Sequence, residues 1–486
     1  MLSGVTPEDA LLARRCKRLL LEKGETDAAA LGERHVAAES ERFLEYVLGR
    51  FSGPMIRVKA TDLEGAVEET DSLMSGAEPP KQLVSPAFSW EEFFARPDFM
   101  RYSNKQEGWK VYLIRPSTGV RGSYLDEAAM DRLILRRAGI PVVAVKVIFL
   151  NKGYVRGEEI QGEELLRESD LTRRAEKRQR SALKLLTTAR DLLSGEERVP
   201  SEYRCDMPGP CSVCRKEMES LPKHSVLTLA RGGKEARQLY LQGVDSILDL
   251  PEGYDLSWRQ SIQLKSVRKN RIHLDRERLG EFLSRLEYPR GYLDFEAFNT
   301  GIPPFPEVAP WEHIPYLFSL HRQDEPSGPV RNATFLMDPG EDQRIAMFRE
   351  LIRLAGDLES LIVFSAPFEA AMIRQLARVA NAPESGEVLI EKIEDLLEPF
   401  NQFVVYHPDQ LGKVSMKRIV PIFTEESYEE LEVQDGLEAN VAYAELFFER
   451  APEAGRSDVL RRLEEYCRQD TSGMVRLVER LEGMLE

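Results

Sequence analysis

The stretch Tyr292-Leu-Asp-Phe-Glu-Ala-Phe298 decides how the C-terminal part of this 486-residue chain is expected to fold. Side chains of a strand alternate between its two faces, so Asp294 and Glu296 share one face and Phe295 lies on the other. Two carboxylates at this spacing are able to share a divalent metal ion. The same spacing recurs elsewhere in this acidic chain, so a solvated strand face is the alternative interpretation of the stretch taken alone.

Strands and helices alternate after this stretch. The apolar segments Tyr316–His321 and Leu361–Ser365 are predicted strands, and residues 457–486 are predicted to form one amphipathic helix. Such alternation is typical of an α/β domain with a mixed sheet. We therefore expect residues 290–486 to form one α/β domain.

Three further polar residues follow these elements. Glu369 falls in the first turns of a helix that leaves the buried strand Leu361–Ser365. Tyr466 and Asp470 are four residues apart and share one face of a helix. A capping or surface side chain explains each of these residues equally well when it is taken alone.

As a set, these side chains resemble the motifs of the DEDD exonucleases, which have the ribonuclease H-like fold. The matching residues are Asp294, Glu296, Glu369, Tyr466 and Asp470. The chain departs from the family pattern at two positions, because Glu369 replaces the usual aspartate and Ser365 stands where asparagine is common. The resemblance implies a metal-dependent exonuclease that works from 3′ to 5′.

The resemblance also implies a role for each residue. Phosphodiester hydrolysis in that family uses two magnesium or manganese ions, about 3.5–4 Å apart and held by hard oxygen ligands. Asp294 and Asp470 would bind the first ion, and Glu296 would help to hold the ion that carries the attacking water. Glu369 would complete the second side of the site, and Tyr466 would orient the water.

The N-terminal half has a different pattern of predicted helices and strands, which indicates a first module over residues 1–220 and a helical connector over 221–289. The connector is followed by the C-terminal domain already described. The elements predicted for the first module are helices within 1–55 and over 125–138 and 165–195, strands over 111–114 and 142–150, and a loop over 202–216.

Three cysteines are clustered in that loop, and a fourth lies far upstream. They are Cys205, Cys211, Cys214 and Cys16. In a large chain without a secretion signal, such a cluster indicates a metal site rather than disulfide bonds. Four thiolates suit either zinc or an iron–sulfur cluster, and their spacing leaves both open.

The cysteines bracket a module that resembles the RecB-like nucleases of the PD-(D/E)xK type, in which a 4Fe–4S cluster joins the two ends of the module. His35 matches the first motif of that family, and Asp98 matches its metal-binding aspartate. The positions of the catalytic glutamate and lysine carry Leu113 and Arg115, and Met130 replaces a glutamine. The resemblance therefore implies an inactive nuclease module that retains nucleic-acid binding.

The order of motifs over nearly the whole chain resembles that of bacterial proteins with the domain of unknown function family 2779. The segments that carry this resemblance are GVDSILDLP at 243–251, YLDFEAFNTGIPPFPEVAPWEHIPYLFSLH at 292–321, YHPDQLGKVSMKRIVP at 406–421 and YCRQDT at 466–471.

The formal net charge of -16 excludes a uniformly basic coat, so contact with DNA or RNA would use local basic segments. The residues expected to make such contacts are Arg173, Arg174, Lys177, Arg178 and Arg180, then Lys265, Arg268, Lys269 and Arg271, and finally Lys413 and Lys417. Solvated helix faces are the alternative interpretation of these basic runs.

The composition, 42% hydrophobic and 30% charged, excludes a disordered chain. No apolar segment is long enough to cross a bilayer, and the N-terminus lacks the apolar core of a signal peptide. We therefore expect a cytoplasmic protein without a membrane partner.

The leading hypothesis is a metal-dependent exonuclease that acts on DNA or RNA and carries an inactive iron–sulfur module. The alternative is a non-catalytic nucleic-acid-binding or scaffold protein with vestigial acidic residues. A third interpretation is a structural protein that zinc stabilises.

Overall fold

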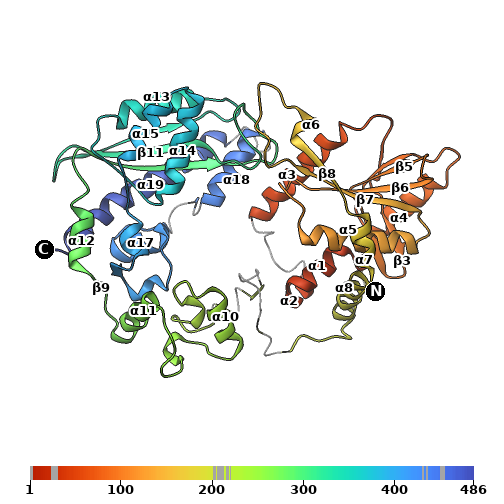
Figure 1. Cartoon of the computed structure of the whole chain (residues 1–486), viewed down its shortest axis with the longest axis horizontal. Coiled ribbons are helices and arrows are strands. Elements are labelled where there is room, and N and C mark those ends of the chain that lie inside the picture. The colour runs from red at the N-terminus through yellow and green to blue at the C-terminus, as the bar shows by residue number, and fades with distance from the viewer. Residues whose placement is uncertain are drawn as a thin grey trace. The chain divides into compact units, whose positions relative to one another are not determined.

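The computed structural model describes residues 4–22, 31–200, 220–428, 436–448 and 455–486, and the isolated residues 204, 213, 214, 218, 432 and 433. The chain divides into two compact units, which Figure 1 shows. Unit 1 consists of Met1–Glu219 and Thr300–Glu312, and unit 2 of Ser220–Asn299 and His313–Glu486. Among the described residues, no helix is both long and apolar enough to span a membrane.

The described residues of unit 1 form eight strands and several helices. Its described helices are α1 (Pro7–Arg15), α2 (Lys17–Leu21), α3 (Leu31–Leu48), α4 (Leu63–Met74), α5 (Gly122–Arg137), α6 (Gly162–Leu165), α7 (Thr172–Lys177) and α8 (Gln179–Ser194). Its strands are β1 (Ile56–Arg57), β2 (Gln82–Val84), β3 (Phe88–Trp90), β4 (Phe93–Ala95), β5 (Phe99–Ser103), β6 (Gly108–Ile114), β7 (Val142–Leu150) and β8 (Leu166–Asp170).

A six-stranded mixed sheet forms the centre of unit 1, in the order β1-β2-β5-β6-β7-β8. Alternate residues of β6 face opposite sides of the sheet, as the period of a strand requires. Val111 packs in one core with α5 and α8, and Tyr112 packs in a second core with α3. Helix α5 connects the parallel strands β6 and β7, and Figure 1 shows α5, α7 and α8 along one side of the strands.

Unit 2 begins with short helices and continues into an α/β region. Its helices are α10 (Gly233–Leu241), α11 (Trp258–Lys269), α12 (Arg276–Leu283), α13 (Arg344–Ala355), α14 (Ala366–Val379), α15 (Pro383–Glu391), α16 (Glu398–Asn401), α17 (Met416–Phe423), α18 (Gly436–Phe447) and α19 (Arg456–Glu482), with the 3-10 helices η1 (Val226–Thr228), η2 (Ile247–Asp249) and η3 (Pro408–Gln410). Its strands are β9 (His273–Leu274), β10 (Arg290–Phe298), β11 (Ile314–Gln323), β12 (Val330–Leu336), β13 (Ser360–Val363), β14 (Ile393–Asp395) and β15 (Val405–Tyr406).

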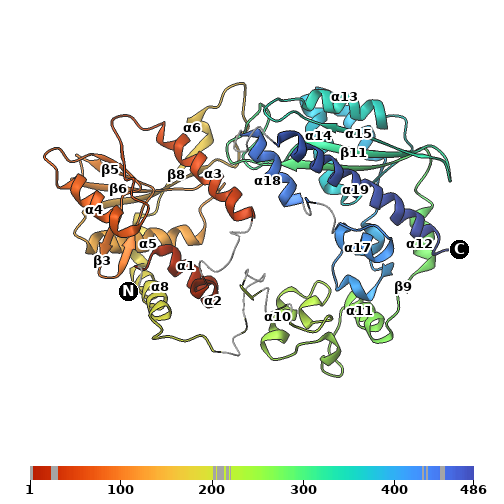
Figure 2. The same cartoon turned by 180° about the vertical axis from the view of Figure 1, so that it is seen from behind.

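The five-stranded sheet of unit 2 has the order β12-β11-β10-β13-β14. Strand β10 pairs antiparallel with β11 and parallel with β13, so it lies at the centre and is buried along its whole length. Helices α13, α14 and α15 lie toward the viewer in Figure 1, and α18 and α19 lie toward the viewer in Figure 2. The expected mixed sheet is therefore present, and the strand that carries the two acids is covered on both faces.

Several predicted elements are confirmed, and one is wrong in part. The expected strand over 142–150 has the bounds of β7, and the expected final helix is α19. The first residues of the expected helix over 165–195 form strand β8 instead. Charged residues obscured this strand in the sequence, because β8 is an edge strand, and charges on an edge oppose pairing with other chains.

The loop expected over 202–216 falls largely outside the described residues. Within it, the structure describes Arg204, Val213 and Cys214, and the last two are helical.

A buried network of hydroxyl groups fixes α19 against the sheet. The Oγ1 atom of Thr471 lies 2.8 Å from Ser319 Oγ and 2.8 Å from His321 Nδ1, both on β11. Asn332 on β12 donates to Ser319 Oγ at 2.9 Å. Burial lowers the pKa of His321 to about 4, so the imidazole is neutral at pH 7. The network sets the rotation of α19 at the residue that follows Asp470.

Replacement of Thr471 tests this network. Thr471→Val keeps the shape of the side chain but leaves Ser319 and His321 with one hydrogen-bond partner fewer in a buried place. We expect the free energy of unfolding to fall by about 1–3 kcal/mol, and Thr471→Ser to lose less. Urea unfolding followed by circular dichroism measures both variants. Equal stability of Thr471→Val and the wild type would contradict the proposed importance of the network.

Candidate metal centre

Three carboxylates from two elements meet beside β10. Ligand oxygens of Asp294, Glu296 and Asp470 all lie within 4.8 Å of one another. Asp294 and Glu296 share a face of β10, and Asp470 reaches them from α19, which packs against this strand. The structure thus brings together the acidic pair and the helical aspartate that the sequence singled out.

Glu369 supplies a fourth carboxylate from α14. Strand β13 pairs with β10 only as far as Tyr292, so the same edge of β10 is open beyond that residue. There the Glu369 carboxylate accepts a hydrogen bond from the backbone amide of Phe295. Burial, followed by repulsion from Asp294 and Glu296, raises the pKa of Glu369 well above its usual value. Glu369 therefore belongs to the same acidic cluster.

Asp395, at the end of β14, positions Glu369 by fixing the start of α14. Its carboxylate accepts hydrogen bonds from the backbone amides of Ser365 and Ala366, at 3.0 and 3.1 Å. Ser365 has a φ of 99°, which is uncommon for a residue other than glycine. The sequence analysis did not identify Asp395, because only the pairing of β14 with β13 brings it to the end of α14.

The surroundings of Asp294 and Asp470, like those of Glu369, disfavour the charged forms of the carboxylates. Burial, together with Asp470, raises the pKa of Asp294 well above its usual value. Burial also raises the pKa of Asp470, to about 6, while Tyr428, Lys417 and Tyr466 act in the opposite direction. The site thus holds its negative charges at a cost in free energy.

Two oxygens of the cluster have no hydrogen-bond partner among the described residues. They are Oε2 of Glu369 and Oδ1 of Asp470, and both are buried. A buried carboxylate oxygen without a partner is costly in protein interiors. A hard divalent cation such as magnesium or manganese prefers such oxygens as ligands. The donor set therefore fits a divalent metal ion, which would also relieve the repulsion.

Three other side chains surround the carboxylates. Lys417 Nζ lies 4.7 Å from the centroid of the Tyr466 ring, and Cys467 Sγ lies 3.5 Å from Asp294 Oδ2. Burial raises the pKa of the Cys467 thiol, so it is protonated and donates to Asp294. The sequence analysis assigned Lys417 to nucleic-acid contacts and no role in the site to Cys467. Their place beside the carboxylates depends on how α17 and α19 pack, which the sequence did not reveal.

The acids near Asp98 in unit 1, where the sequence predicts a degenerate nuclease site, have an arginine among them. Arg115 Nη1 lies 2.5 Å from Asp98 Oδ2, and the other terminal nitrogen pairs with Glu127. Asp131 is buried next to these groups, and burial followed by Glu127 and Asp98 raises its pKa. Two further positions of the predicted degenerate motif, Leu113 and Met130, are buried in the core. A guanidinium therefore provides the positive charge in this cluster.

His35, which the sequence analysis matched to the first RecB-like motif, is also buried in unit 1. Its ring packs edge-on against Trp311, with 6.3 Å between the ring centroids. Trp311 belongs to the segment Thr300–Glu312, in which Gly301 N donates to Glu39 Oε2 at 2.9 Å. The segment between β10 and β11 thus packs on α3 of unit 1.

Two of the four proposed cluster cysteines are described, and they are close together. The Sγ atoms of Cys16 and Cys214 are 3.6 Å apart and both residues are buried. Thiolates that share one tetrahedral zinc, with bonds of about 2.3 Å, stand about 3.8 Å apart. Cys205 and Cys211 lie outside the described residues. The separation of the described pair is close to that of two zinc-bound thiolates, and it equally fits a hydrogen bond between two thiols.

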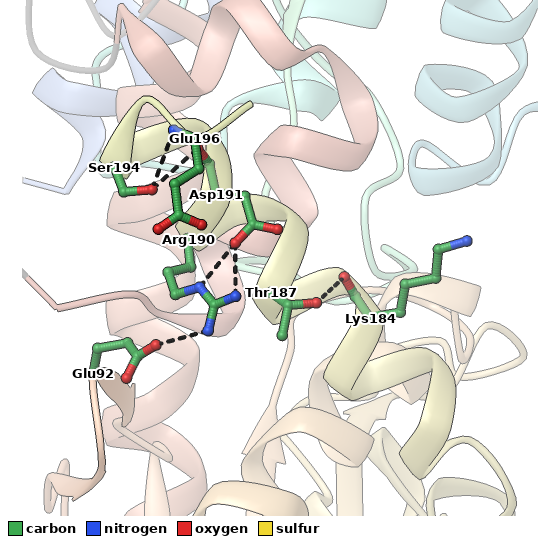
Figure 3. A network of polar contacts seen from close by, with 7 residues as sticks. All are labelled: Glu92, Lys184, Thr187, Arg190, Asp191, Ser194 and Glu196. Atoms are coloured by element: carbon green, nitrogen blue, oxygen red, sulfur yellow. Dashed lines mark hydrogen bonds and ion pairs between the residues drawn. The ribbon is translucent and has the colours of Figure 1, made fainter. Parts of the chain in front are cut away.

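The basic residues of unit 1 are partly neutralised. Arg178 pairs with Asp126 at 2.5 Å, and Figure 3 shows Arg190 held by Asp191 and Glu92 at 2.7 and 3.1 Å. The other predicted contact residues, except Lys417, have no ion pair with a described carboxylate; they are Arg173, Arg174, Lys177, Arg180, Lys265, Arg268, Lys269, Arg271 and Lys413.

One family model matches the chain. It is described as "Domain of unknown function (DUF2779)" and matches residues 291–415, which include Asp294, Glu296 and Glu369. This match supports the family resemblance seen in the sequence. No curated protein and no solved structure matches the chain.

The pKa of Asp470 predicts how stability depends on pH. Its value of about 6 exceeds that of an unfolded aspartate, about 3.9, so the folded chain binds this proton more tightly. That contribution to stability is complete below about pH 4 and is lost as the pH rises through about 6. We expect Asp470→Asn to raise the free energy of unfolding on the order of 1–3 kcal/mol at pH 8 in chelator, with little change at pH 4.

Urea unfolding at the two pH values checks this prediction. Asp458→Asn is a matched control, because Asp458 lies on the same helix but is paired with Arg461 and Arg462. The control is expected to give no gain in stability at pH 8. A loss of stability in Asp470→Asn at pH 8 would show that the charge of Asp470 does not destabilise the folded chain.

Proposed function

We propose that the chain is a metal-dependent exonuclease that hydrolyses phosphodiester bonds of DNA or RNA from the 3′ end, with its active site in unit 2. The observation that carries this proposal is the meeting of Asp294, Glu296 and Asp470, whose ligand oxygens lie within 4.8 Å of one another. The buried Glu369 beside them completes the four carboxylates of the DEDD pattern.

The arrangement of unit 2 supports a ribonuclease H-like fold for this domain. The Asp-x-Glu pair lies on the first and central strand of a mixed five-stranded sheet. Glu369 lies in the first turn of the helix that follows β13, and Asp470 lies on the last helix. These are the three places where the DEDD motifs are expected.

The side chains of the site divide the work of hydrolysis. When bound, two magnesium or manganese ions would lower the pKa of the attacking water and stabilise the leaving oxygen. Asp294, Glu296, Asp470 and Glu369 would hold them. The Tyr466 hydroxyl lies beside Asp470, as its effect on that pKa indicates, and is the group proposed to orient the water. Burial of the carboxylates keeps bulk water away from their charges.

For unit 1 we propose an inactive RecB-like module that binds nucleic acid and holds a metal through its cysteines. Two observations support this assignment. Arg115 neutralises Asp98 and Glu127, and the sulfur atoms of Cys16 and Cys214 lie together. A 4Fe–4S cluster is the cofactor that the family resemblance implies, and zinc is the alternative. We place the protein in the cytoplasm, with DNA or RNA as its partner.

The activity is tested with end-labelled single-stranded DNA and RNA in magnesium, in manganese and in chelator. We expect shortening from the 3′ end that needs the metal and falls at least about a hundredfold in Asp294→Ala, since removal of a metal ligand removes most of the catalysis. Glu359→Ala changes an acid in unit 2 that lies outside the carboxylate cluster and should retain activity.

Either of two results would contradict the assignment. Cleavage that persists in Asp294→Ala would place the activity elsewhere or in a contaminant. No cleavage by the wild type, with nucleic-acid binding intact, would favour the non-catalytic binding or scaffold protein.

The cysteine site is tested by metal analysis of protein purified without oxygen. An iron–sulfur cluster predicts bound iron and a broad absorbance at about 400 nm, whereas zinc predicts a colourless protein. Cys16→Ser should lose the metal, and Cys467→Ser, which removes the thiol beside Asp294, should keep it. Metal content that is unchanged in Cys16→Ser would exclude Cys16 as a ligand.

A further inference from the structure

Helix α11 of unit 2 presents an aromatic and cationic face to solvent. Trp258, Lys265 and Lys269 are seven and four residues apart, which places them on one side of the helix. Trp258 is 49% exposed, although a tryptophan side chain is usually well buried. The opposite side of α11 is buried, as Gln263 and Leu264 show.

The cations around this face have no acidic partner among the described residues. Lys265, Arg268, Lys269 and Arg271 are exposed, and none of them forms an ion pair with a described carboxylate. In a chain of net charge -16, this group of unpaired cations is locally basic. It forms a surface that attracts anions.

Two arginines extend the same surface and lie side by side. Arg231 Nη2 donates to Asn401 Oδ1 at 2.8 Å, and Arg259 Nε donates to the Asn401 carbonyl oxygen at 3.1 Å. Burial, followed by the positive charge of Arg231, lowers the pKa of Arg259. No described carboxylate pairs with either guanidinium, so a bound anion would relieve their repulsion.

Packing holds Trp258 in a fixed orientation. The Arg259 guanidinium carbon lies 4.1 Å from the centroid of its ring. The ring also meets Phe403 edge-on, at 6.2 Å between centroids, and Phe403 in turn stacks on Tyr406 at 4.6 Å. A half-exposed aromatic ring that is already ordered loses little conformational entropy when another ring stacks on it.

We propose that this face binds single-stranded nucleic acid, with Trp258 stacking on a base and the surrounding lysines and arginines contacting phosphates. The face is defined by Trp258, Arg231, Arg259, Lys265, Arg268, Lys269 and Arg271. Single strands bind proteins through this combination of aromatic platforms and cations, whereas a duplex keeps its bases stacked internally. The proposal rests on the proposed nuclease function and deepens it, because it names the form of the substrate.

The face belongs to the same unit as the acidic cluster. Helix α11 packs against η3, η3 packs against α17, and α17 packs against α19, which carries Asp470. Figures 1 and 2 both show α17 between α11 and α19. A strand bound to α11 would thus be held by the domain that carries the candidate metal centre.

The test measures binding of the full chain to fluorescently labelled single-stranded DNA and RNA, by anisotropy, in chelator so that no hydrolysis occurs. Trp258→Ala should weaken binding about tenfold, and Trp258→Tyr should retain most of the affinity, because both aromatic rings stack on bases. The tryptophan fluorescence of the wild type should fall on binding, and this change should be smaller in Trp258→Tyr.

Charge reversal separates this face from charge in general. The double variant Lys265→Glu/Lys269→Glu should bind more weakly and show a salt dependence whose logarithmic slope is smaller by about 0.7 for each lost phosphate contact. The double variant Lys59→Glu/Lys105→Glu, at two exposed lysines of unit 1 outside the predicted contact residues, makes the same change in net charge and should weaken binding less. Thermal melting confirms that each variant is folded. If Trp258→Ala does not fold, Trp258→Tyr tests the stacking role instead.

Three results would overturn the proposal: unchanged affinity in Trp258→Ala, equal losses in the two double variants, or tighter binding to duplex DNA or to phosphatidylserine vesicles than to single strands. The outcome is independent of catalysis. Single-strand binding through Trp258 by a wild type that cleaves nothing would contradict the proposed exonuclease and leave the binding face in place. Cleavage that needs Asp294 but not Trp258 would support the proposed exonuclease and contradict the binding face.

Discussion

Repulsion among buried carboxylates is the constraint on which unit 2 depends. Asp294, Glu296, Glu369 and Asp470 are held close together away from solvent, and burial raises the pKa of three of them. Such an arrangement persists only where the surrounding structure enforces it. The hydroxyl network at Thr471 holds α19, the Asp395 carboxylate fixes the start of α14, and the central place of β10 holds the strand pair. A bound divalent cation would remove the repulsion among these carboxylates, so the relief of repulsion would favour metal binding.

Unit 1 also has acids close together, and there an arginine side chain of the protein neutralises their charge. Asp98 and Glu127 both pair with Arg115, at the position where the proposed RecB-like motif would have its lysine. A guanidinium is always charged and forms fixed hydrogen bonds, so it neutralises the acids without a metal ion. The two units therefore contrast in one respect: the acids of unit 1 have a protein cation between them, and those of unit 2 have buried oxygens without partners.

The sequence was informative where local periodicity determines geometry. The alternation along Tyr292–Phe298 and the spacing of Tyr466 and Asp470 were sufficient to place acids on shared faces, and apolar runs located β7 and α19. It was uninformative where long-range pairing decides. Sequence pattern alone assigns no role in the site to Asp395 or Cys467. The pairing of β14 with β13 and the packing of α19 on β10 bring them to the site. The basic runs looked alike in the sequence, and only packing revealed that Arg178 is neutralised by Asp126 whereas the cations of α11 lie beside an exposed tryptophan.

Manganese binding to the metal-free protein tests the central claim most directly. Titration calorimetry at pH 8 should detect binding to the wild type, with release of protons from carboxylates whose pKa is raised. The double variant Asp294→Asn/Asp470→Asn should bind no manganese at this site, because two of its four charged ligands are gone. Equal affinity and stoichiometry in the wild type and the double variant would show that the four carboxylates are not a metal centre and would contradict the account.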